Sequence, residues 1–170
     1  MHQSARKFAI AAVFSVIVFA SKAFAPAPLK DSFIVVQALL LGLSGLMITP
    51  FGATLVSTIA GLLLAGRNPS LAIFSIIFSA LYGVMLDVLL LALHPLRGRG
   101  KLDAKRFILA VATSTAAIGL IAYTVTLTLQ LLPRNPAVEA AVLAAGGISG
   151  VIGGYLGVLV WRRIAPYFQT

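Results

Sequence analysis

Long apolar runs alternate with short polar breaks along the chain, and the breaks hold most of its prolines and charged residues. A helix needs about 20 residues to cross a hydrocarbon core about 30 Å thick. No polar stretch is long enough to form a second domain. The pattern therefore predicts an all-α integral membrane bundle of about six transmembrane helices in a single domain, residues 1–170, with helices over approximately 6–23, 32–48, 51–65, 70–93, 107–132 and 137–160.

Two of these segments, 32–48 and 51–65, are barely long enough to span a bilayer. They are either two short spanning helices or a re-entrant pair hinged at Pro50. In both cases the chain enters and leaves this stretch on the same side of the membrane, so the orientation of the later segments is the same.

Composition supports the membrane interpretation. Hydrophobic residues make up 60% of the chain and charged residues 10%, whereas soluble domains average roughly 45–50% and about 25%. The net charge of +9 raises the possibility of nucleic-acid binding. We expect no nucleic-acid partner, because the charges sit in short clusters at the ends of apolar runs, where topology signals belong. The partner is instead the lipid bilayer.

The basic residues also predict an orientation. With six crossings and both termini cytoplasmic, nine face the cytoplasm and four, Lys22, Lys30, Arg67 and Arg134, face outward, as the positive-inside rule requires. The nine are Arg6, Lys7, Arg97, Arg99, Lys101, Lys105, Arg106, Arg162 and Arg163. We therefore expect a multi-pass protein of the cell membrane, with Trp161 as an interfacial anchor.

The N-terminal segment also fits a signal peptide. Arg6-Lys7 precedes an apolar run over 8–20, and Ala23-Phe24-Ala25 has the A-x-A form of a cleavage site. We treat the segment as a retained first helix, because cleavage would leave five helices and break the charge pattern.

Ionisable residues inside a membrane are costly and are candidates for function. Asp87 is an intramembrane acid in the fourth segment. It is either a structural acid, hydrogen-bonded within the bundle or paired with Arg106, or a ligand, proton or coupling site. Glu139 lies near the start of the sixth segment, where a carboxylate complements the helix N-terminus.

Amide and hydroxyl side chains gather toward the outer half of the membrane in this topology. They predict an outward-facing pocket for a small polar molecule, with the substrate-binding residues Gln37, Asn68, Tyr123, Gln130 and Glu139. A carboxylate at its mouth would suit a cationic or amine-bearing ligand.

The sequence carries no signature of an enzyme. It has no cysteine, and its two histidines are His2 at the terminus and His94 at a helix end. It also lacks a Walker motif. We expect no catalytic residue, no metal site and no resident cofactor.

Small residues recur four apart, as they do where membrane helices pack closely. The sixth segment carries Gly146, Gly150 and Gly154. The first carries two such pairs, Ala5 with Ala9 and Ala11 with Ser15. These stripes are either ordinary bundle packing or, on an outward face, docking surfaces for a partner.

The stretch 39–61 has a glycine-punctuated run, a break at Thr49-Pro50 followed by Gly52, and an Ala60-Gly61 pair. It resembles the second and third helices of the S components, the substrate-binding membrane subunits of energy-coupling factor (ECF) transporters. The stretches 79–87 and 146–154 are similar to later helices of that family. Size, helix number and inward termini agree over nearly the whole chain.

The resemblance implies high-affinity capture of a vitamin or vitamin precursor near the outer face, as part of an importer. It implies as partners a shared transmembrane subunit and a pair of cytoplasmic ATPases. The family's first helix carries an A-x-x-x-A docking motif, for which Ala5 with Ala9, or Ala11 with Ser15, are the nearest matches. The proline-glycine hinge and short loops resemble the thiamine-precursor type.

Two other functions remain open. The chain could be a non-transporting structural or assembly subunit of a larger membrane complex, with the small-residue stripes as interfaces. It could also be a self-contained small transporter or channel, with Asp87 as its proton or ion site.

Overall fold

The computed structural model describes residues 2–24, 33–48, 50–67, 69–97, 101–130 and 135–168. Asn68, Ala25, Lys30, Arg99 and Arg134, named above, lie outside these ranges. The helices are α1 (His2–Phe24), α2 (Phe33–Met47), α3 (Gly52–Arg67), α4 (Ala72–Leu93), α5 (Ala104–Thr128) and α6 (Pro136–Ile164), with short 3-10 turns at Pro69–Leu71 and Ala165–Phe168. A small antiparallel hairpin joins α4 to α5 and pairs β1 (Leu96–Arg97) with β2 (Lys101–Leu102).

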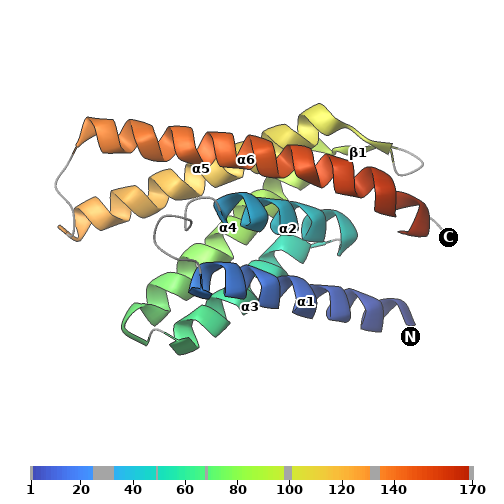
Figure 1. Ribbon diagram of the computed structural model, residues 1–170, viewed down its shortest axis with the longest axis horizontal. Coiled ribbons are helices and arrows are strands. Elements are labelled where there is room, and N and C mark those ends of the chain that lie inside the picture. Colours follow the sequence, from blue (N-terminus) through green and yellow to red (C-terminus); the bar gives the residue numbers. More distant parts are fainter. Residues whose placement is uncertain are drawn as a thin grey trace.

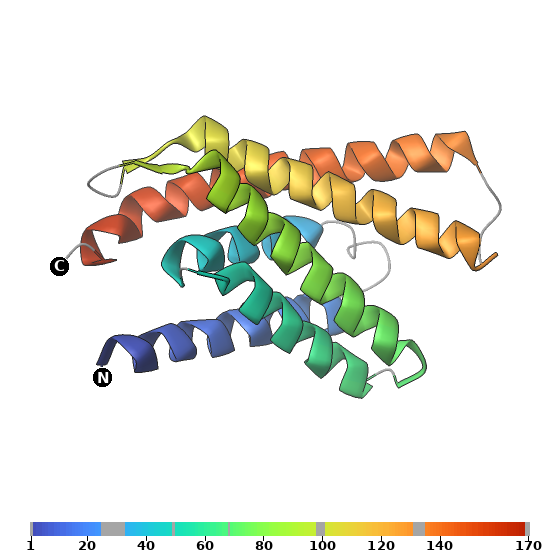
Figure 2. The ribbon, with the colours of Figure 1, turned by 180° about the vertical axis from the view of Figure 1, so that it is seen from behind.

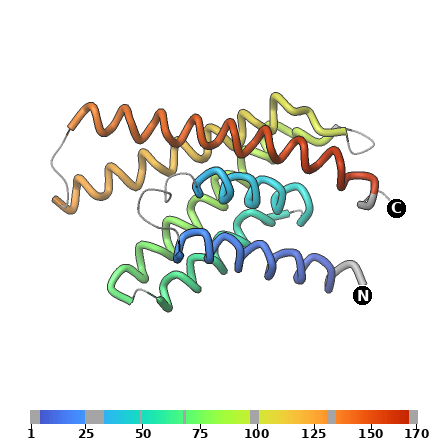
Figure 3. Tube along the Cα trace, viewed as in Figure 1, coloured from blue at the N-terminus to red at the C-terminus, as the bar shows by residue number. Residues whose placement is uncertain are grey.

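The helices form two antiparallel pairs, α3 with α4 and α5 with α6. Figures 1 and 2 show the pairs meeting near the two termini and diverging toward the opposite end. Helix α2 lies between the pairs and contacts α3 and α6, and α1 packs along α3. The Cα trace in Figure 3 shows that both chain ends, the α2–α3 turn and the hairpin share one end of the molecule.

The all-α prediction is confirmed. Within the described residues, four helical stretches are long and apolar enough to cross a membrane: Ala5–Phe24, Pro69–Leu93, Ala104–Thr128 and Pro136–Ile164. Helices α2 and α3 have only 15 and 16 residues, which corresponds to about 22–24 Å at a rise of about 1.5 Å per residue. The structure thus supports a membrane protein.

Capping residues correct two of the predicted helix ends. Helix α5 begins at Ala104, three residues before the predicted start, because the Asp103 side chain accepts a hydrogen bond from the Arg106 backbone N–H at 3.4 Å. Helix α6 begins at Pro136, where the Asn135 side chain accepts from the Ala137 N–H at 3.0 Å.

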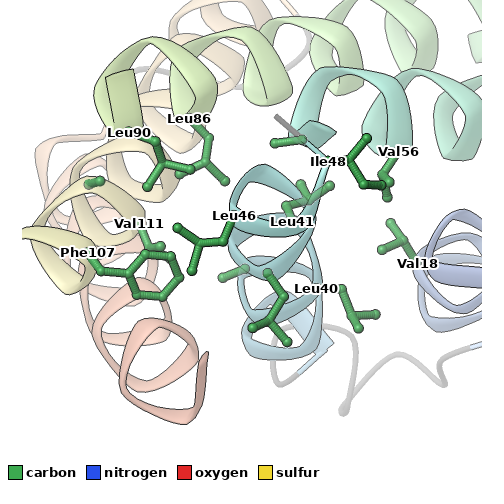
Figure 4. Packing of buried hydrophobic residues seen from close by; sticks show 14 of the residues in the cluster. Val18, Leu40, Leu41, Leu46, Ile48, Val56, Leu86, Leu90, Phe107 and Val111 are labelled. Carbon is green, nitrogen blue, oxygen red and sulfur yellow. The ribbon is translucent and has the colours of Figure 1, made fainter. Parts of the chain in front are cut away.

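A continuous apolar core joins the two pairs through α2. Leu41 and Leu46 of α2 lie between Val56 of α3 on one side and Phe107 and Val111 of α5 on the other (Figure 4). The outer surface is also apolar: Ile73 is 71% exposed and Phe8 is 68% exposed. A helical bundle with exposed apolar side chains on its flanks is what lipid, acting as the solvent, requires.

The glycine stripe of α6 has a packing role. An ideal Cβ on Gly150 would lie 2.6 Å from the Cα of Ala112 on α5, and one on Gly146 would lie 3.0 Å from the Cα of Ala116. One on Gly153 would lie 2.8 Å from the Cβ of Ala38 on α2. These glycines therefore allow α6 to approach both α5 and α2 at backbone distance.

Two sequence-based interpretations need correction. Trp161 is only 6% exposed and packs in the core, so its ring is not at the surface of the bundle, where an interfacial anchor would lie. Ala11 and Ser15 are also buried, and the Ser15 hydroxyl lies 3.1 Å from the Val56 carbonyl oxygen of α3. Both side chains therefore lie inside the bundle and are not available for docking.

Candidate functional site: a cavity between the helix pairs

A cavity of about 620 Å³ lies where the two helix pairs diverge. Five helices form its wall, and each contributes residues from the half that lies away from the termini, with Tyr82 and Thr115 at the middle of theirs. The lining residues are Lys22, Ile34, Gln37, Phe78, Tyr82, Thr115, Ile118, Gly119, Ala122, Ala137, Val138, Ala141, Val142, Ala145 and Gly146. Its volume is within the range of about 300–1,000 Å³ that is usual for small-molecule sites.

Small side chains on α5 and α6 leave the space open. Gly119 and Ala122 on α5 face the cavity one helical turn apart, and Ala141 and Ala145 do so on α6. Along α5 the lining extends from Thr115 to Ala122, about 10 Å at the α-helical rise. The cavity can therefore hold a molecule of several rings or a medium-length chain.

A hydrogen bond joins α4 and α5 where the cavity reaches the middle of the bundle. The Tyr82 hydroxyl lies 2.8 Å from the Thr115 hydroxyl, and Thr115 donates its own proton to the Val111 carbonyl at 2.7 Å. Since a threonine hydroxyl has one proton, Tyr82 is the donor to Thr115. The Tyr82 oxygen keeps the capacity to accept a further hydrogen bond.

Two further polar groups line the wall. Lys22, in the last turn of α1, is partly buried, and Gln37 on α2 is 8% exposed. Within the described part of the chain neither side chain makes a hydrogen bond or an ion pair. Among the described residues, every fully buried side-chain N or O atom has a hydrogen-bond partner. The amide of Gln37 has no partner, so it is not fully enclosed and reaches the open space of the cavity.

The predicted substrate residues only partly coincide with this site. Gln37 lines the cavity. Tyr123 instead hydrogen-bonds the Asn135 backbone, donating to its carbonyl at 3.1 Å and bracing the α5–α6 connection. Gln130 is exposed beyond the end of α5, in a left-handed conformation with φ 57°. Glu139 is partly buried in the first turn of α6 but is not on the cavity wall.

Lys22, Tyr82 and Thr115 were not among the predicted site residues. Lys22 was assigned only a topological role, although a lysine two residues inside an apolar helix end is a signal for a polar site. Tyr82 and Thr115 gave no local signal, because their juxtaposition depends on how α4 crosses α5.

The Asp87 carboxylate is hydrogen-bonded inside the bundle. Its two carboxylate oxygens accept from the backbone N–H groups of Ala53 (3.2 Å) and Thr54 (2.8 Å), and from the Thr54 hydroxyl (2.7 Å). These donors belong to the first turn of α3, where the helix dipole stabilises a negative charge. Arg106 is not its partner: it contacts Asp103 at 3.5 Å and donates to the Leu93 carbonyl.

A glycine makes this cap possible. An ideal Cβ on Gly83, one turn before Asp87, would lie 2.5 Å from the Cα of Thr54. Without a side chain at 83, α4 approaches α3 closely enough for Asp87 to reach the N–H groups. The contacts favour the structural interpretation of Asp87 over that of a proton or ion site.

Metal binding has no support in the described ranges, where no three His, Cys, Asp or Glu side chains come together. In the same ranges, the cavity wall holds two polar side chains that make no hydrogen bond or ion pair, Lys22 and Gln37.

Comparison with known proteins gives no assignment. No protein-family model matches the chain, and no curated protein or solved structure matches it significantly.

Proposed function

We propose that the chain is the substrate-binding membrane subunit of an ECF-type importer that captures a vitamin or vitamin precursor at the outer face. The observation that carries this proposal is the cavity of about 620 Å³ between the helix pairs. It has an apolar wall with a few convergent polar groups, which is the usual composition of a small-molecule site. The resemblance of 39–61 to the S components supports the same function.

The topology in this proposal has six crossings and cytoplasmic termini. Eight of the described basic residues lie on the segments at the end that holds both termini, and two, Lys22 and Arg67, lie toward the other end. By the positive-inside rule, this distribution supports termini in the cytoplasm and a cavity toward the outside. The eight are Arg6, Lys7, Arg97, Lys101, Lys105, Arg106, Arg162 and Arg163.

The exposed face of α1 is the proposed docking surface for the transmembrane coupling subunit. Ala5 and Ala9 lie one turn apart on this face and are both exposed. Because Ala11 and Ser15 are buried, Ala5 with Ala9 is the remaining match to the family's A-x-x-x-A motif.

The test separates capture from assembly. A tagged chain purified from its native membranes in mild detergent is expected to bring down a transmembrane subunit and two ATPases, and to bind a vitamin or precursor. Ala9→Trp should lose the partners and keep the ligand. Ala122→Trp, which fills the cavity, should keep the partners and lose the ligand.

Ala144→Trp, on an exposed position of α6 outside the cavity wall, is the matched control and should change neither result. A chain that is isolated alone and binds no vitamin or precursor in a calorimetric panel would refute the proposal. Association with an unrelated membrane complex would favour the structural-subunit function.

A further inference from the structure

We propose that the cavity takes a lipophilic carboxylic acid in its anionic form, with Lys22 as the counter-ion of the carboxylate. This inference rests on the proposed function and names the substrate class of the same site. It reverses the charge expected from the sequence, where Glu139 suggested a cationic or amine-bearing ligand.

The charge of the wall carries the argument. Among the described residues, Lys22 is the one charged side chain that lines the cavity, and the remaining lining is aliphatic, aromatic, hydroxyl or amide. An ammonium group in apolar surroundings attracts an anion far more strongly than it would in water. A cationic ligand would meet repulsion from Lys22 and no compensating carboxylate among the described lining residues.

Gln37 supplies the second polar contact. It is more than nine-tenths buried, lines the same cavity and makes no hydrogen bond within the described part of the chain. A carboxylate has two oxygens that accept hydrogen bonds, and an amide NH₂ is a donor. One carboxylate has an acceptor oxygen for each of these two donors, the Lys22 ammonium and the Gln37 amide, whereas a neutral hydroxyl ligand has a single oxygen.

The rest of the cavity defines the body of the ligand. Phe78, Ile118 and Val142 give an apolar surface, and Tyr82 offers one acceptor near the middle of the bundle. A ligand with several charges or many hydroxyl groups would leave polar atoms without partners on this wall. The wall therefore favours one anionic group on a largely apolar body.

Three probes with the same body and different head groups test this class directly: phenylbutyrate, phenylbutanol and phenylbutylamine. Calorimetry on the purified full chain should give the tightest binding for phenylbutyrate and the weakest for phenylbutylamine. Lys22→Met should weaken phenylbutyrate binding by roughly 10- to 100-fold, which corresponds to the loss of one charge-assisted hydrogen bond. Phenylbutanol binding should persist, which shows that the cavity is intact.

Two variants act as controls. Lys101→Met, which removes the same charge from the exposed hairpin, should leave all three affinities unchanged. Lys22→Arg should keep the preference for the acid, because it keeps the cation. Ala122→Trp should remove binding of all three probes, which separates cavity binding from partition into detergent.

The substrate class is overturned if phenylbutylamine binds as well as phenylbutyrate, if the preference for the acid survives Lys22→Met, or if a phospholipid occupies the cavity and excludes all three probes. These results do not depend on the importer. A carboxylate preference in a chain without ATPase partners would keep the substrate class and refute the importer. A chain that has ATPase partners but shows no carboxylate preference would keep the importer and refute the substrate class.

Discussion

At the scale of the residue, the one buried acid among the described residues is surrounded by hydrogen-bond donors. Asp87 receives three hydrogen bonds from the first turn of α3. A buried carboxylate is tolerated when it is hydrogen-bonded and lies at the positive end of a helix. Asp87 thus fixes α3 against α4, and its carboxylate contributes to the stability of the fold.

Asp87→Asn should therefore reduce the free energy of unfolding by about 2–3 kcal/mol, because an amide NH₂ would replace an acceptor oxygen and face backbone donors. Thermal unfolding in detergent would measure the change. The matched substitution Asp103→Asn, at the α5 N-cap, should cost less than about 1 kcal/mol because Asn is an equally good cap and the exposed Arg106 pair is weak. A D87N variant as stable as the wild type, with transport abolished, would restore the proton-site interpretation.

At the scale of the element, close helix packing depends on which glycines face a neighbour. Gly150 and Gly147 are both on α6, but an ideal Cβ at 150 would collide with the backbone of α5, whereas one at 147 would have no heavy atom within 4 Å. The two positions therefore differ in whether a neighbouring helix packs directly against them.

Gly150→Ala should destabilise the bundle by about 1–3 kcal/mol, as overpacking does. Gly147→Ala should be neutral or stabilise by up to about 1 kcal/mol through helix propensity. Equal effects of the two substitutions on the unfolding midpoint would contradict the α5–α6 packing described here.

The apolar pattern of the sequence predicts the existence and order of all six helices, and it fails at their ends and at the site for physical reasons. Hydropathy cannot show that α5 starts at Ala104, because Lys105 and Arg106 are polar and the start is set by the Asp103 cap. Gln37 was predictable as a polar residue in an apolar helix. Tyr82 and Thr115 were not, because their meeting depends on the angle between α4 and α5.

At the scale of the whole molecule, two divergent helix pairs leave a cavity at one end and hold both termini at the other. The chain has no cysteine, so single cysteines can report the side of each end. With a membrane-impermeant maleimide on intact cells, Arg67→Cys should be labelled, and Lys101→Cys should be labelled only after the membrane is opened. The opposite pattern would invert the proposed topology.

The central claim is that the cavity between the helix pairs binds a small molecule, and native mass spectrometry of the detergent-purified chain with a panel of vitamins and precursors tests it most directly. We expect one bound species of defined mass on the wild type and on Ile73→Trp, a substitution on the exposed outer surface. The same species should be absent from Ala122→Trp. A wild-type chain that binds no member of the panel, or a ligand that Ala122→Trp retains, would contradict the assignment of the cavity as the binding site.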